Sequence, residues 1–129
     1  MSLKLKGRKL SSICGTGVDI IEIPRIKKAY ERWGNNFLEK IYLPHEIDYC
    51  LRKVNPYPSL AARFAAKEAC FKALSQSGIH IALWRGISVG RAPDGRPHLI
   101  VPKASGVRLH LSLTHSKEFA IAMVIVERD

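Results

Sequence analysis

The sequence predicts an α+β fold: a largely antiparallel sheet with one long helix packed on one of its faces. Three observations predict it. An apolar strand comes early, helical segments follow it, and the last third of the chain consists of short strands joined by tight turns. Helices and strands that are grouped along the chain, rather than alternating one by one, are typical of α+β proteins.

Local signals place the first strand and two helices. Residues 12–21 form an apolar strand that contains Gly-Thr-Gly, whose glycines permit close backbone approach. A helix is expected from Pro24, which suits a first helical turn, to about Gly34, which supplies the stop. Pro44 opens a second helix that runs to about Lys53.

The long helix is expected from Ser59, as its N-cap, to about Gly78. Residues 60–74 are rich in alanine and contain no proline or glycine, which favours a helix. Phe64, Glu68 and Lys72 follow the spacing i, i+4, i+8 and share one face, and we expect Arg63 and Lys67 beside it. The simplest interpretation is a solvated face with a Glu68–Lys72 ion pair.

The C-terminal part reads as strands. Between Val107 and Thr114 apolar and polar residues alternate strictly, which indicates a strand with one buried face. Pro93 to Pro97 is a turn. The expected strands are 86–90, 98–101, the alternating segment 107–114, and 119–126.

Length and composition indicate one globular domain at 12–129, preceded by a basic N-terminal extension at 1–11. No apolar run approaches the roughly 20 residues of a membrane span, and we recognise no secretory signal. Three widely spaced cysteines suggest reduced side chains and a cytoplasmic protein. The net charge of +10 indicates an anionic partner: nucleic acid, an acidic protein or a phosphate-rich small molecule.

Two acids stand in unexpected places. Asp19 lies inside an apolar strand, and Glu68 lies among cations on the long helix. A carboxylate in apolar surroundings needs a partner, so Asp19 is paired with a cation, capped by backbone amides or bound to a metal. If the first strand lies beside the long helix, the two carboxylates converge and suit Mg²⁺, which prefers oxygen ligands.

Two further groups of residues are candidates for binding anions. His115 and Ser116 follow a strand end, where with Thr114 they offer hydrogen bonds to a phosphate. In the helix after Pro24, a basic stripe is expected opposite a buried side that includes Trp33. This stripe is either a solvated face or a docking surface for an acidic helix or a phosphate backbone, and its members are Arg25, Lys28 and Arg32.

Three motifs in order carry a family resemblance. They are Gly-Thr-Gly-Val-Asp-Ile-Ile-Glu-Ile-Pro-Arg-Ile at 15–26, Arg-Phe-Ala-Ala-Lys-Glu-Ala-Cys-Phe-Lys-Ala-Leu at 63–74 and Leu-Ser-Leu-Thr-His-Ser at 111–116. Together they resemble the holo-acyl-carrier-protein synthases, the small members of the phosphopantetheinyl transferase superfamily. The turn Asp-Gly-Arg-Pro at 94–97 matches a further family element, and the likeness covers about residues 13–127.

The resemblance implies a phosphopantetheinyl transferase-like fold and a Mg²⁺-dependent reaction of fatty acid biosynthesis. Phosphopantetheine passes from coenzyme A to a serine of apo acyl carrier protein, and adenosine 3′,5′-bisphosphate leaves. The implied metal ligands are Asp19 and Glu68, and Lys72 is implied to neutralise the α-phosphate. Either Glu68 or a metal-bound water held by Asp19 is the base. The coenzyme phosphates are expected near Arg63, Lys67, His115 and Ser116, and the carrier protein near Arg25, Lys28 and Arg32.

The family is typically a homotrimer with sites at subunit interfaces, so the resemblance implies a trimer. The alternative from the residues alone is a basic α+β module that binds nucleic acid without catalysis, which the net charge supports equally well. That alternative does not explain Asp19 and Glu68, because both would repel phosphates unless a metal intervenes.

Overall fold

The structure is a computed structural model that describes residues 3–5 and 8–129, with side chains from Leu10 onward. Its elements in chain order are β1 (Leu3–Leu5), β2 (Arg8–Leu10), β3 (Ser12–Glu22), α1 (Ile23–Trp33), α2 (Asn35–Ile41), α3 (Pro44–Leu51), α4 (Tyr57–Gln76), the 3₁₀ turn η1 (Trp84–Gly86), β4 (Ser88–Arg91), β5 (Pro97–Ile100), β6 (Val107–His115) and β7 (Phe119–Arg128).

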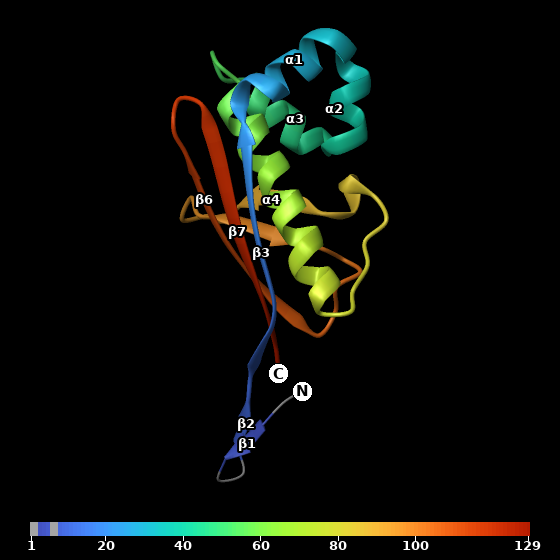
Figure 1. Ribbon diagram of the computed structural model, residues 1–129, viewed down its shortest axis with the longest axis vertical. Helices are drawn as coiled ribbons and strands as arrows, with labels where there is room; N and C mark the ends of the chain where they lie inside the picture. The colour runs from blue at the N-terminus through green and yellow to red at the C-terminus, as the bar shows by residue number, and fades with distance from the viewer. Residues whose placement is uncertain (1–2, 6–7) are drawn as a thin grey trace.

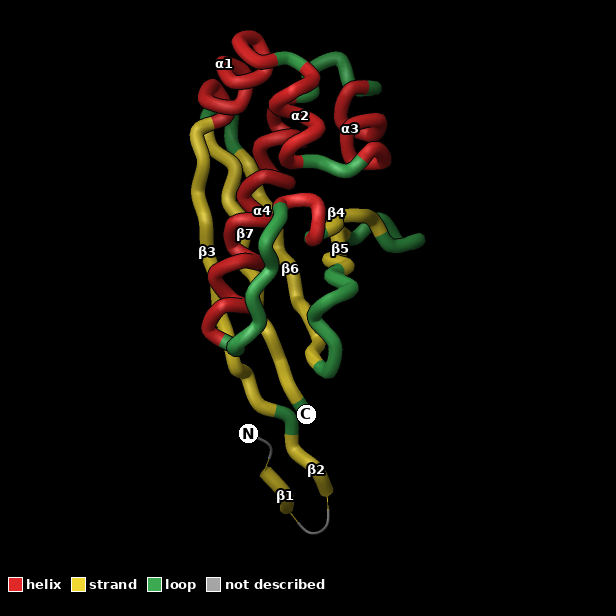
Figure 2. The backbone as a smooth tube through the Cα atoms, turned by 90° about the vertical axis from the view of Figure 1, so that its right-hand side faces the viewer, coloured by secondary structure: helices red, strands yellow, loops and turns green. Residues whose placement is uncertain are grey.

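The main sheet has the order β3-β7-β6, with both pairs antiparallel, and α4 packs on one of its faces (Figure 1). The hairpin of β4 and β5 lies on the other side of α4, while α1, α2 and α3 gather at one end (Figure 2). This arrangement confirms the predicted α+β class. It also makes β3 an edge strand that lies directly beside the long helix.

Two glycines bring β3 and α4 into close contact. A Cβ atom on Gly15 would overlap the carbonyl oxygen of Ala73, and one on Gly17 would overlap that of Ala69. The Thr16 amide also donates a hydrogen bond of 2.9 Å to Oε1 of Gln76. The close backbone approach that the Gly-Thr-Gly segment predicted is therefore present, and it places the following residues of β3 against the helix.

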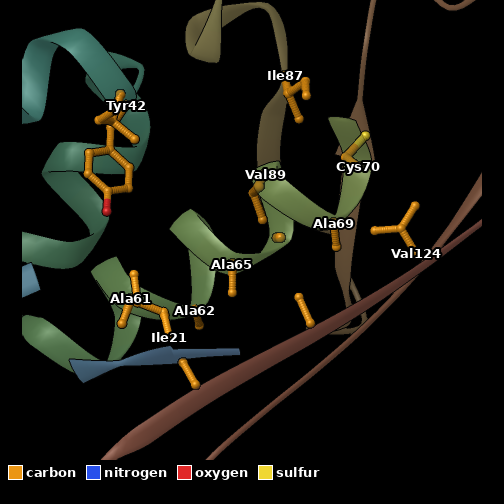
Figure 3. Close-up of a cluster of buried hydrophobic side chains, with 14 of the residues drawn as sticks. Ile21, Tyr42, Ala61, Ala62, Ala65, Ala69, Cys70, Ile87, Val89 and Val124 are labelled. Atoms are coloured by element: carbon orange, nitrogen blue, oxygen red, sulfur yellow. The ribbon is translucent and has the colours of Figure 1, made fainter. Parts of the chain in front are cut away.

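The helix α4 is enclosed on two sides. Figure 3 shows Ala62, Ala65 and Ala69 on the side of α4 that faces the strands, with Tyr42 and Val89 on another side. All five residues are buried. Alanine suits this position because its small side chain lets the strands and the other helices approach the helix backbone closely.

Several elements differ from the sequence-based expectation. The helix α4 begins at Tyr57 after Pro56, so Ser59 lies buried inside the helix instead of capping it. The seven-residue α2 was not expected, and it exists because Leu38 and Ile41 bury their side chains in the core.

The expected extension 1–11 contains the β1–β2 hairpin, whose register pairs Leu3 with Leu10. Residues 1–2 and 6–7 of that extension lie outside the described residues. The expected stop at Gly34 is confirmed, because this glycine ends α1 with a positive φ of 57°. A positive φ is readily adopted by glycine alone among the common residues.

The face of the main sheet that points away from α4 is apolar and open. Val18 and Ile20 of β3 are 61% and 59% exposed, and Met123 of β7 is 46% exposed. The register pairs Val18 with Met123 and Ile20 with Ile121, so these side chains form one continuous patch, the outer sheet patch. Among the described helices, none has the length and apolar character needed to cross a bilayer.

Candidate functional site

Asp19 points toward α4 because of its place in β3. Along this strand Gly17 and Ile21 are buried and Val18 and Ile20 are exposed, so the alternation places Asp19 on the helix-facing side. The strand is at the edge of the sheet, so the carboxylate lies at the rim of the core instead of within it. Its side chain is 18% exposed.

Lys72 of α4 meets Asp19 at this rim. Its ammonium lies 3.3 Å from Oδ1 of Asp19 and donates a hydrogen bond of 3.1 Å to the carbonyl of Val18. The Lys72 side chain is 53% exposed, so the pair is weak and open to solvent. Lys72 therefore links α4 to β3.

Glu68, one turn before Lys72, shares the same rim. Partial burial raises the pKa of its carboxyl group, the negative charge of Asp19 raises it further, and the charge of Lys72 partly offsets both effects. The two carboxylates are thus close enough to repel each other, as the sequence hypothesis of converging acids requires. In the described part of the chain, no three His, Cys, Asp or Glu side chains gather into a metal cluster.

Lys67 does not join this rim. Its side chain is 0% exposed and forms an ion pair of 2.8 Å with Glu46, which is equally buried. Burial lowers the pKa of the Lys67 ammonium, and Glu46 offsets part of this effect. Because its donors are occupied inside the protein, the expected contact between Lys67 and coenzyme A is not supported by its position.

Arg63 is also buried, at 4% exposure, beneath a group of cations. Its guanidinium stacks on the Tyr49 ring at 4.3 Å, and its Nη1 donates to the carbonyl of Ser59 at 3.4 Å. Its Nε is buried without a hydrogen-bond partner. Lys53 and Arg91 approach the same ring at 4.7 and 5.4 Å, so this corner is strongly positive.

His115 and Ser116 end the opposite edge strand, β6. The register aligns His115 with Ala120 of β7 and Ala120 with Ile21 of β3, so two strand spacings, about 9.6 Å, separate the two edges. The Ser116 hydroxyl accepts hydrogen bonds from the amides of Glu118 and Phe119. Within one chain, the structure does not bring these residues to Asp19.

The basic stripe lies on α1 as expected, and Arg25, Lys28 and Arg32 are all exposed. The expectation for Trp33 was wrong: it is the last residue of α1 and is 57% exposed. Arg32 stacks on the Trp33 ring at 4.8 Å.

Sequence reasoning missed Glu46 and Trp84. Because Lys67 lies in an alanine-rich helix, it could be expected to need a buried counter-ion. Glu46 lies 21 residues earlier in the chain, however, and no local pattern identifies it as that counter-ion. Trp84 stacks on Phe64 with ring centroids 4.9 Å apart, which explains the aromatic residue on the face of Glu68.

Comparisons with known proteins identify the family of this chain. A family model for the 4′-phosphopantetheinyl transferase superfamily matches residues 15–124. The holo-[acyl-carrier-protein] synthase of Koribacter versatilis is 45% identical over 123 residues, which cover 89% of this chain and 98% of the relative. That of Chlamydia trachomatis serovar D is 49% identical over 119 residues, 88% of this chain and 98% of the relative.

Solved structures show the same fold. A holo-(acyl-carrier-protein) synthase from Bacillus anthracis, in complex with CoA (3′,5′-ADP), has a TM-score of 0.77 and 36% identity, covering 91% of this chain and 98% of the other. One from Helicobacter pylori, in complex with coenzyme A, has a TM-score of 0.74 and 34% identity, covering 86% and 98%. With sequence and fold matched over most of its length, the chain belongs to the 4′-phosphopantetheinyl transferase superfamily.

Proposed function

We propose that this protein transfers phosphopantetheine from coenzyme A to a serine of apo acyl carrier protein, with Mg²⁺ as cofactor. One observation carries the proposal: a strand carboxylate and a helix carboxylate share one open rim with a lysine that bridges the two elements. Relatives that share this fold are named holo-acyl-carrier-protein synthases, and two of them were solved with coenzyme A or its 3′,5′-ADP part.

The residues at the rim fit a magnesium ion. Asp19 and Glu68 supply carboxylate oxygens, and their mutual repulsion would be relieved by a cation between them. Two carboxylates leave room for water and substrate phosphates, which Mg²⁺ usually retains as ligands. When bound, the ion would neutralise charge on the pyrophosphate of coenzyme A.

The remaining groups would serve the transfer directly. The serine oxygen forms a bond to the β-phosphorus, the bond from that phosphorus to the bridging oxygen breaks, and adenosine 3′,5′-bisphosphate leaves with the electron pair. Lys72, which is half exposed, would turn from Asp19 to stabilise charge on the α-phosphate. Glu68 would take the serine proton, because its carboxylate lies at the open rim beside Asp19 and Lys72.

Coenzyme phosphates would be held by cations and hydrogen-bonding groups beyond the rim itself. Arg63 has a buried Nε without a partner and stands among other cations, which suits an anion. His115 and Ser116 would contribute from a neighbouring subunit. Lys67 is left out of this set because it is buried against Glu46.

The decisive experiment is mass spectrometry of an apo acyl carrier protein incubated with this protein, coenzyme A and Mg²⁺. The expected result is a mass gain of one phosphopantetheine that chelation of the metal prevents. An unmodified carrier protein would rule out the transferase, and modification that persists in chelator would rule out the metal.

We predict that Arg25→Glu raises the KM for the carrier protein by about tenfold and leaves the KM for coenzyme A unchanged. Arg25 is exposed on α1, where with Lys28 and Arg32 it presents positive charge to an acidic helix. Steady-state kinetics with each substrate varied in turn checks this. Lys103→Glu, an exposed charge reversal on the loop after β5, is the control, and equal effects on both substrates would contradict docking on α1.

A homotrimer would complete the site. The outer sheet patch presents exposed Val18, Ile20 and Met123, an area that a second copy of the chain would cover. In a closed ring each interface joins two different surfaces, so the β3 edge of one copy can meet the β6 end of the next. That arrangement would bring His115 to Asp19 without any change within the chain.

We predict that two inactive variants, Glu68→Gln and His115→Ala, regain activity when they are refolded together. In a ring whose sites combine two subunits, random mixing restores about a quarter of the sites to wild-type composition. Activity of the mixture against each parent measures this, with the mass from light scattering as the control for assembly. A mixture as inactive as its parents would place the whole site within one chain.

Only the net positive charge supports the alternative of a nucleic-acid-binding module. The charge does not explain the rim that Asp19 and Glu68 share, where two carboxylates would repel a phosphate backbone. A cytoplasmic setting completes our proposal, and the free thiols of Cys14, Cys50 and Cys70 support it.

A further inference from the structure

A buried ion pair ties three parts of the chain together behind the site. The Lys67 ammonium donates to Oε1 of Glu46 at 2.8 Å, to the carbonyl of Ile87 at 2.6 Å and to that of Trp84 at 3.2 Å. Glu46 accepts from the amides of Leu43 at 2.7 Å and Val89 at 2.8 Å. The pair thus links the start of α3, the middle of α4 and the segment from η1 into β4.

Stability alone does not account for such a pair. Taking two charges out of water is costly, and a well-packed apolar pair of similar volume is often as stable or more so. Apolar side chains would not hold the carbonyls of Trp84 and Ile87, because they have no donors. The specific effect of the Lys67 ammonium is therefore to fix the backbone of the 84–87 segment against α4.

The segment that it fixes carries the Trp84 ring. This ring stacks on Phe64 with centroids 4.9 Å apart and meets Phe71 edge-on at 5.2 Å. Phe64, Glu68 and Phe71 follow the spacing i, i+4, i+7 along one stripe of α4. Trp84 therefore covers the helix surface on which Glu68 stands, and forms an aromatic wall at one side of the rim.

We propose that the buried Glu46–Lys67 pair is a positioning device for the transfer: by holding the carbonyls of Trp84 and Ile87, it sets the aromatic wall beside Glu68. Lys67 is thus a positioning residue that acts through Trp84 and touches no substrate. The wall excludes water from one side of the reacting phosphates and limits where coenzyme A can lie. This inference rests on the proposed role of Glu68 in the transferase site.

The test uses the double variant Glu46→Gln/Lys67→Met in the full chain. It removes both charges together, so no lone charge is left buried and we expect the protein to fold. It also removes the donors to the Trp84 and Ile87 carbonyls. The expected result is a fall in kcat/KM for coenzyme A of up to about 10²-fold, with the KM for the carrier protein unchanged.

Tryptophan fluorescence measures the position of the aromatic wall in the absence of substrate. The chain has two tryptophans, so in a Trp33→Phe background all tryptophan emission comes from Trp84. The double variant should shift this emission to longer wavelength, because the ring leaves Phe64 and becomes solvated. The matched control is Asp48→Asn/Arg52→Met, which removes an ion pair at the end of α3 whose side chains are 63% and 77% exposed, and it should leave emission and kinetics unchanged.

Trp84→Leu provides the second variant, because it removes the wall while the ion pair stays. We expect it to reproduce the kinetic defect. Wild-type kcat/KM for coenzyme A in Trp84→Leu would overturn the proposal, as would wild-type kinetics and unshifted emission in the folded double variant. A fully active Glu68→Gln would instead refute the proposed role of Glu68, and the emission shift would still decide whether the pair positions Trp84.

Discussion

Glu68→Gln is expected to reduce phosphopantetheine transfer by about 10³-fold or more while the protein stays folded. The substitution keeps the size of the side chain and removes the charge that would hold Mg²⁺ and accept the serine proton. Transfer measured by mass spectrometry at saturating coenzyme A and Mg²⁺ checks this. Glu39→Gln, at an exposed position of α2, is the matched control and should retain full activity.

The same variant should be at least as stable as the wild type at neutral pH. The pKa of Glu68 is raised in the folded protein above its ordinary value of 4.5, so the ionised carboxylate opposes folding. The advantage of the glutamine variant should be absent well below pH 4.5 and appear as the pH rises through the folded pKa. Wild-type turnover, or a marked loss of stability at neutral pH, would contradict the assigned role.

Gly17→Ala is expected to have the largest effect on stability, a loss of about 3 kcal/mol. A Cβ atom at this position would overlap the carbonyl oxygen of Ala69, which is helix backbone and cannot rotate away. The strand β3 must therefore move from α4 and carry Asp19 away from Lys72. For a chain of this size the melting temperature should fall by on the order of 10 °C, and activity should fall with it.

Thermal unfolding and denaturant titration measure this prediction. The control is Gly90→Ala in β4, where the new Cβ would meet the His98 ring at 3.1 Å. A side chain can shift by a few tenths of an ångström, so the control should lose much less stability than Gly17→Ala. Equal losses would show that close contact between β3 and α4 is not what Gly17 provides.

The local pattern of α4 predicted the shared face of Glu68 and Lys72 and misplaced Lys67. Helical spacing sets the angles between side chains, and a stripe of large apolar residues normally shows which angle faces the core. In α4 the alanines are spread around the helix, and 12 of its 20 residues are buried. Without an apolar stripe, the sequence does not reveal that Lys67 points inward and Glu68 outward.

Elements that depend on contacts with distant segments could not be predicted from the local sequence either. The short α2 has no cap or long periodic pattern, and it is held by the burial of Leu38 and Ile41. Trp33 belongs to an amphipathic pattern, yet its side chain is exposed at the end of α1. Trp84 follows a loop whose local sequence shows no preference for packing on Phe64.

By itself, the sequence determined the α+β class, the glycines that let the first strand approach another element closely, and the two carboxylates with Lys72. These follow from residue periodicity, from glycines without a Cβ and from the cost of unpartnered charge, which act locally. Only the tertiary structure decided that Lys67 pairs with Glu46, that His115 stands two strands away from Asp19, and that the outer face of the sheet is open. These depend on which distant segments pack together, and in an alanine-rich helix no local pattern records that choice.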